Sequence, residues 1–86
     1  MDNCDIRHIL AFNIKYYRFK KGITQEQLAE KCDISPRYIS DIENGKGNIP
    51  IDTLSNISFV LNVEPYILLK NNGFKCVLPK RVNMKK

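Results

Sequence analysis

The fold is decided by residues 24–43, which read TQEQLAEKCDISPRYISDIE. Thr24 and Gln27 have the spacing of a capping box, in which the threonine hydroxyl accepts a hydrogen bond from a backbone N–H and the glutamine amide reaches back to the cap. Ser35 and Pro36 form a second start signal, because serine is a favoured N-cap and proline suits the first helical position. This stretch therefore predicts two short helices, the second starting only three residues after Cys32.

So short a connection forces the two helices to cross steeply and to share one apolar seam, as in a helix-turn-helix. The residues at helical spacing that supply this seam are Leu28, Ala29, Cys32, Ile34, Ile39 and Ile42. Ala29 is predicted to lie where the helices approach most closely. A larger side chain there would overpack the seam, at a cost of about 1–3 kcal/mol.

The second of these helices also has an outward face. Because successive residues turn by ~100° around a helix, Arg37, Asp41 and Asn44 lie opposite the isoleucines, with Tyr38 and Ser40 beside them. Glu43 points inward instead. A carboxylate in that position needs a partner if it is to remain charged.

The pattern resembles the helix-turn-helix of the phage-repressor, or xenobiotic-response-element (XRE) type, family of bacterial regulators. The matching residues are Gln25, Leu28-Ala29, Ile39 and Ile42-Glu43-Asn44-Gly45. The resemblance extends from about Ile14 to Leu69 and implies an all-α, five-helix, lambda-repressor-like DNA-binding domain. It also implies that Arg18 forms a salt bridge with Glu43. One departure is Asp33, where the family usually has glycine, and aspartate tolerates the left-handed conformation better than most residues.

Three further helices are predicted outside this stretch. One runs from about Asp5 to Lys20, one begins near Pro50, and one opens with Pro65. The residues predicted to face inward on the first two are Ile6, Ile9, Leu10, Ile14, Tyr17, Ile51, Leu54, Ile57 and Leu61. Phe12, Tyr16 and Phe19 form a second stripe on the first helix, which either packs under the tail or the fifth helix or belongs to a dimer surface.

The last two helices carry more apolar side chains than one side of so small a core can cover. These residues are Phe59, Val60, Val63, Tyr66 and Leu69. The corner between the fourth and fifth helices is therefore the predicted twofold homodimer interface.

The chain has 86 residues and a net charge of +5, and its basic residues are unevenly distributed. Residues 1–69 carry eight basic and nine acidic side chains, whereas residues 70–86 carry six basic side chains and no acidic one. We expect a DNA-binding domain over residues 1–70 and a basic extension over 71–86. Within the extension, Phe74 to Leu78 is either a short strand or an extended arm, and the basic end is either a DNA-contacting arm or a solvated tail.

Several other classes of protein are not supported. No apolar stretch is long enough to cross a bilayer and no signal peptide is evident, so we expect a cytoplasmic protein without a membrane partner. Cys4 and His8 are spaced as two metal ligands, but nothing completes the set, and we expect no metal and no cofactor. The single histidine has no nucleophile at recognisable spacing and no glycine-rich phosphate loop is present, so an enzyme is not predicted.

The outward face of the helix over residues 35–44 suits the major groove of DNA. Base-reading positions are predicted at Arg37, Tyr38, Asp41 and Pro36. Arg37 is the strongest candidate, since a guanidinium can bind guanine N7 and O6 together, worth about 1–3 kcal/mol against a wrong base. Contacts to the DNA backbone are predicted from Gln25, Ser40, Asn44, Lys46 and Asn48.

The sequence thus predicts a transcription regulator that binds a palindromic site on double-stranded DNA as a homodimer. A controller protein of a restriction–modification system, a phage or plasmid repressor, and an antitoxin that represses its own operon all fit. A protein-interaction module that keeps the fold without binding DNA is the alternative from another class. The near-neutral helical region favours it, whereas Arg37, Gln25 and Lys46 count against it.

Overall fold

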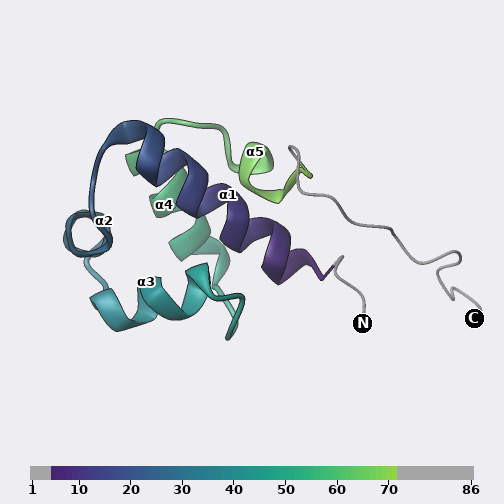
Figure 1. Ribbon diagram of the computed structural model, residues 1–86, viewed down its shortest axis with the longest axis horizontal. Coiled ribbons are helices and arrows are strands. Elements are labelled where there is room, and N and C mark those ends of the chain that lie inside the picture. The colour runs from purple at the N-terminus through teal and green to yellow at the C-terminus, as the bar shows by residue number, and fades with distance from the viewer. Residues whose placement is uncertain (1–4, 72–86) are drawn as a thin grey trace, which may run out of the picture.

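The computed structural model describes residues 5–71, which form five helices and no strand (Figure 1). The helices are α1 (Ile6–Lys21), α2 (Gln25–Cys32), α3 (Pro36–Glu43), α4 (Ile51–Leu61) and α5 (Pro65–Leu69). The all-α, five-helix prediction is confirmed. The predictions that concern Cys4, the segment from Phe74 to Leu78 and the basic end lie outside the described residues.

The predicted helix starts are present as hydrogen bonds. Thr24 Oγ1 accepts from Gln27 N at 3.0 Å, while Gln27 Oε1 accepts from Thr24 N at 2.8 Å, which completes the capping box at α2. Ser35 Oγ accepts from Tyr38 N at 3.0 Å, and a proline occupies the first turn of α3. Each cap satisfies a backbone donor that has no partner inside the helix.

The helices α1, α2 and α4 are each followed directly by a residue with positive φ, namely Gly22, Asp33 and Asn62. After α3 the positive-φ residue is Gly45, one position later, because Asn44 has φ −100°. At the end of α2, Asp33 N donates to Glu30 O at 3.1 Å and Ile34 N donates to Ala29 O at 3.0 Å, which is the Schellman pattern. Asp33, at φ 59°, adopts the left-handed conformation that the sequence predicted at the turn.

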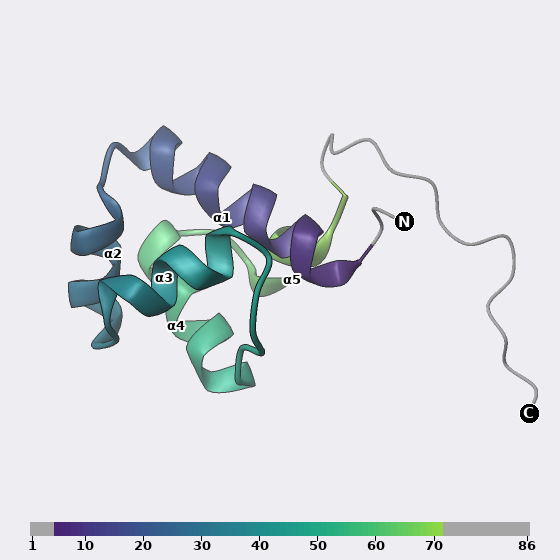
Figure 2. The same cartoon turned by 60° about the horizontal axis from the view of Figure 1, so that its bottom comes forward.

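The core is built by α1 packing against α3, α4 and α5, and by α2 packing against α3 and α4. Figure 2 shows α1 lying across the top of the other helices, with α3 in front. The seam between α2 and α3 is as predicted, because Leu28, Ala29 and Ile39 are fully buried. Around it lie the other buried members of the core cluster, namely Leu10, Ile14, Cys32, Ile42, Leu54, Ile57, Leu61 and Leu68.

Two residues predicted to face the core are exposed instead. Ile6 is 50% exposed and Ile51 is 77% exposed, and each is the first residue of its helix. Hydrophobic spacing gives the direction in which a side chain leaves the helix axis, but it does not say how far along the axis the core extends. Tyr17, predicted on the same inner face as Ile6, is only half-buried.

Candidate nucleic-acid interface

A buried polar cluster joins the ends of three helices behind the proposed DNA-binding face. Arg18 Nε donates to Glu43 Oε2 at 2.6 Å, and Arg18 Nη2 donates to Glu43 Oε1 at 3.0 Å. Arg18 Nη1 also donates to the backbone oxygen of Ile23 at 3.0 Å. Both charged side chains are almost inaccessible, at 8% and 1% exposed. The inward-facing carboxylate therefore has the partner that the resemblance implied.

Gln25 belongs to this cluster, which changes its predicted role. Its Nε2 donates to Glu43 Oε1 at 3.0 Å, so the amide is already used inside the protein rather than held out toward a phosphate. The sequence did not reveal this bond, because Gln25 and Glu43 are 18 residues apart and meet only when α2 crosses α3. What Gln25 still offers at the start of α2 is its backbone N–H.

The outer face of α3 carries the predicted base-reading side chains in solvent. The side chain of Arg37 is 84% exposed and that of Asp41 is 40% exposed, and Arg37 Nε lies 3.7 Å from Asp41 Oδ1. Pro36 and Asn44 are also exposed and Ser40 is half-buried. In Figure 2, no other described helix lies in front of α3. The fold thus leaves this face open.

Tyr38 is placed differently from its predicted role. Its ring is half-buried against the core, and its hydroxyl donates to the backbone oxygen of Asn48 at 2.9 Å. The hydroxyl therefore supports the loop after α3.

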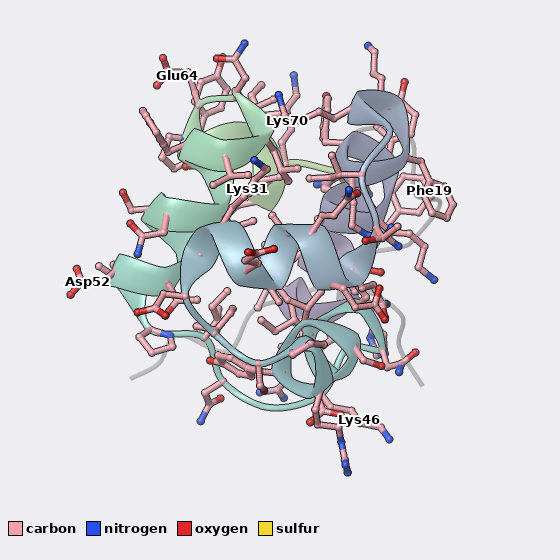
Figure 3. All side chains as sticks on the ribbon, turned by 90° about the vertical axis from the view of Figure 1, so that its left-hand side faces the viewer. Phe19, Lys31, Lys46, Asp52, Glu64 and Lys70 are labelled. Atoms are coloured by element: carbon pink, nitrogen blue, oxygen red, sulfur yellow. The ribbon has the colours of Figure 1, made fainter. Side chains whose placement is uncertain are left out.

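Lys46 is singled out by how α3 ends. After α1, α2 and α4, the residue that follows the positive-φ position is apolar and packs on the core. These residues are Ile23, Ile34 and Val63. At the end of α3 the equivalent residue is Lys46, whose N–H donates to Asp41 O at 2.9 Å and whose side chain is exposed. Figure 3 shows Lys46 pointing away from the fold, at the opposite end from Glu64. Asn48, also exposed, follows in the same loop.

The predicted dimer surface is partly covered in the single chain. Phe59 is 84% exposed, Tyr66 is 64% exposed and Leu69 is 39% exposed, whereas Val60 and Val63 are half-buried against the core. An open groove of about 400 Å³ lies beside Phe59, lined in part by Ser55, Ser58 and Asn62. The corner of α4 and α5 therefore offers both a projecting ring and a hollow.

Within residues 5–71, no cluster of three or more histidine, cysteine or acidic side chains is arranged to hold a metal ion. In the same range, no helix is long and apolar enough to cross a membrane. Burial raises the pKa of the Cys32 thiol, so this cysteine behaves as a core residue.

Fold and face together define a helix-turn-helix domain, and the comparisons with known proteins agree. The helix-turn-helix family HTH_3 matches residues 14–68, and the chain belongs to this family of non-enzymatic transcription regulators. A hypothetical transcription factor of Neisseria meningitidis serogroup B is 35% identical over 68 residues, covering 79% of this chain and 64% of that protein. Control protein C.BamHI of Bacillus amyloliquefaciens is 39% identical over 66 residues, covering 76% of this chain and 82% of that protein.

Solved structures show the same likeness. The crystal structure of the Neisseria transcription factor superposes with a TM-score of 0.74 at 35% identity, over 77% of this chain and 76% of that one. The wild-type restriction–modification controller protein C.Esp1396I superposes with a TM-score of 0.67 at 36% identity, over 73% of this chain and 82% of that one.

Proposed function

We propose that this protein is a sequence-specific transcription regulator that acts in the cytoplasm and binds a palindromic site on double-stranded DNA as a homodimer. The observation that carries the proposal is the outer face of α3. Arg37 and Asp41 stand in solvent there, on a helix whose opposite face is fixed by the Arg18–Glu43–Gln25 cluster.

Arg37 is suited to read a base because its guanidinium makes only a weak interaction within the protein. An exposed ion pair at i, i+4 is worth only about 0.3–0.5 kcal/mol, so Asp41 orients the guanidinium without retaining it. A bidentate contact to guanine is worth about 1–3 kcal/mol of discrimination. Replacing Asp41 by guanine as the partner of the Arg37 guanidinium is therefore favourable.

The remaining contacts position the domain on the phosphates. Lys46 and Asn48 extend from a loop that the Tyr38 hydroxyl braces, while the first backbone N–H groups of α2 face the same anionic backbone. In this proposal Tyr38 contacts DNA through its ring and holds the loop through its hydroxyl. Ser40 and Asn44 complete the backbone contacts from α3.

Homodimerisation follows from the corner of α4 and α5. Phe59, at 84% exposed, stands beside a groove of about 400 Å³, so a twofold axis would let the ring of each subunit enter the hollow of the other. Two copies of α3 would then meet half-sites about 34 Å apart, or a multiple of that spacing.

Among regulators, the extent of the match to the control proteins favours a controller-type protein. The match covers 82% of C.BamHI and 84% of the C.SmaI control protein of Serratia marcescens. It covers only 35% of the immunity repressor of Bacillus phage phi105. The match therefore extends over most of each control protein and over about a third of the repressor.

The test is to select bound sequences from a random double-stranded DNA pool with the wild type, Arg37→Lys and the control Lys31→Ala. Lys31 lies on α2, on a different side of the molecule from Lys46 (Figure 3). The wild type should enrich a palindrome with a guanine at the same place in each half. Arg37→Lys keeps the positive charge but cannot make the bidentate contact of a guanidinium. It should lose about 1–3 kcal/mol of preference at that guanine alone.

Lys31→Ala should retain the wild-type motif. Failure of the folded wild type to enrich any sequence would overturn the proposal. It would favour the protein-interaction module, with which the eight basic and nine acidic side chains of residues 1–69 are consistent.

A further inference from the structure

We propose that Asn13 is a positioning residue for the homodimer, because its side chain fixes the C-terminal end of α5 and thereby the side chains that α5 presents to a second copy of this chain. The inference rests on the proposed homodimer. Asn13 is 1% exposed on α1, and hydrophobic spacing gave no reason to expect a polar residue there.

The contacts of Asn13 all go to one short piece of backbone. Its Nδ2 lies 3.3 Å from Ile67 O, 2.9 Å from Leu68 O and 2.7 Å from Lys70 O. These oxygens lie at the end of α5, where carbonyls generally lack intrahelical donors, and Ile67 O also accepts from Lys70 N at 3.4 Å. The side chain thus acts as a C-cap supplied by another helix, more than 50 residues earlier in the chain.

The orientation of the amide follows from those partners. Asn13 Oδ1 is buried and has no hydrogen-bond partner among the described residues. The opposite orientation would set an acceptor against three carbonyl oxygens, so the nitrogen must face α5. An acceptor is left unpaired so that the donors can reach the helix end.

α5 depends on such an anchor because it is weak by itself. It has five residues, no side-chain cap at its start, and an extended residue, Lys70, at its end. Isolated helices of this length do not persist in water. Leu68 is its one buried residue and sets the depth of α5, while Ile67 is half-buried. Loss of the Asn13 contacts would let α5 pivot about Leu68.

A pivot about Leu68 would displace the part of the proposed dimer surface that lies on α5. Tyr66 and Leu69 lie on either side of Leu68 along α5 and are exposed, as Phe59 of α4 is. α5 packs mainly against α1 and α4, whereas α2 and α3 pack against each other (Figure 1). A twofold axis repeats each displacement in the partner, which doubles its effect on the interface.

The experiment compares the full-length wild type with Asn13→Leu, which is of similar size and removes the donors, and Asn13→Ala, which removes the whole amide. Ile39→Val is the matched control, since it weakens the core at a fully buried position in α3. Dimer dissociation is measured by sedimentation equilibrium at a temperature where each variant is folded. Backbone hydrogen exchange is followed separately for α5 and α3.

Both Asn13 variants should weaken dimerisation at least about tenfold, equivalent to ~1.4 kcal/mol. They should also speed exchange in α5 selectively, whereas Ile39→Val should change exchange throughout and leave dimerisation within about threefold of the wild type. If the wild type dimerises, and both Asn13 variants dimerise as tightly and exchange as slowly in α5 as the wild type does, this inference alone is overturned. A monomeric wild type at high concentration overturns the proposed homodimer instead.

Discussion

Arg37 and Asp41 are separated by one turn of α3, and their side chains meet across 3.7 Å in solvent. Arg18 and Glu43 form the opposite kind of pair, buried and bidentate. The first pair is weak enough to open for a base, whereas loss of one partner from the second would strand a buried charge at a cost of about 3–5 kcal/mol. At the residue scale, exposure therefore separates the groups proposed to read DNA from those that hold α3 in place.

Asp41→Ala should broaden sequence preference more than it weakens binding, because the carboxylate orients Arg37 and can accept from a cytosine amino group. Binding to a panel of operators with single base changes measures this. The penalty for changing the base that faces Arg37 should fall by about 1 kcal/mol. Glu30→Ala, an exposed acid on α2, is the control for lost negative charge. An equal gain in affinity for every operator would instead show simple repulsion between Asp41 and the phosphates.

At the scale of elements, each helix is specified mainly at its ends. Start signals at Thr24 and Ser35 and positive-φ residues after α1 to α4 fix the helix lengths, and four short connections then limit how the helices can pack. The end of α3 has an additional restriction. A Cβ built on Gly45 would lie 2.8 Å from Cδ2 of His8, on α1.

Gly45→Ala and Gly22→Ala form a matched pair for measuring that restriction. Gly45 has φ 75° and Gly22 has φ 78°, but a Cβ on Gly22 meets nothing within 4 Å. Both changes should cost roughly 1–2 kcal/mol of unfolding free energy for the left-handed backbone. Gly45→Ala should cost about 0.5–1.5 kcal/mol more, since the exposed His8 ring must leave its rotamer.

Urea denaturation of each variant measures these costs. Adding His8→Ala to Gly45→Ala should remove the difference between the two glycines. An undiminished difference would mean that the backbone of the loop, and not the His8 ring, makes Gly45 more sensitive.

For the whole molecule, the two proposed surfaces occupy different elements. The DNA-binding face lies on α3 and the loop after it, and the dimer surface lies on α4 and α5 (Figures 2 and 3). α1 packs against α3, α4 and α5 and so connects them rigidly. In a palindromic complex this rigid connection would set the distance between the two reading helices.

Phe59→Lys should therefore yield a folded monomer with weakened binding to the palindrome. Phe59 is 84% exposed in the single chain, so the substitution removes little core packing, while loss of a central interface aromatic commonly costs about 2 kcal/mol or more, roughly 30-fold in dimerisation. Sedimentation equilibrium and circular dichroism measure the two effects.

Ile51→Lys is the control for this prediction, because Ile51, like Phe59, is an apolar and largely exposed residue of α4, at 77% exposed. It should dimerise like the wild type. If Ile51→Lys dissociates the dimer and Phe59→Lys does not, the interface lies at the start of α4.

The sequence by itself determined the helix starts, the left-handed turn at Asp33, the seam around Ala29 and the all-α fold. These features depend on residues close together in the chain, where capping chemistry and helical spacing act directly. It also indicated the outward direction of Arg37 and Asp41, since a helix of known start has a known phase.

Only the tertiary structure decided the exposure of Ile6 and Ile51, the inward bonds of Gln25 and Tyr38, and the anchoring of α5 by Asn13. Spacing along a helix gives the direction of a side chain but not the extent of the core that it faces. Polar side chains, moreover, bond to whichever donor or acceptor the packing of distant segments brings within 3 Å or so. Their partners are therefore fixed by how the helices cross, which no short stretch of sequence specifies.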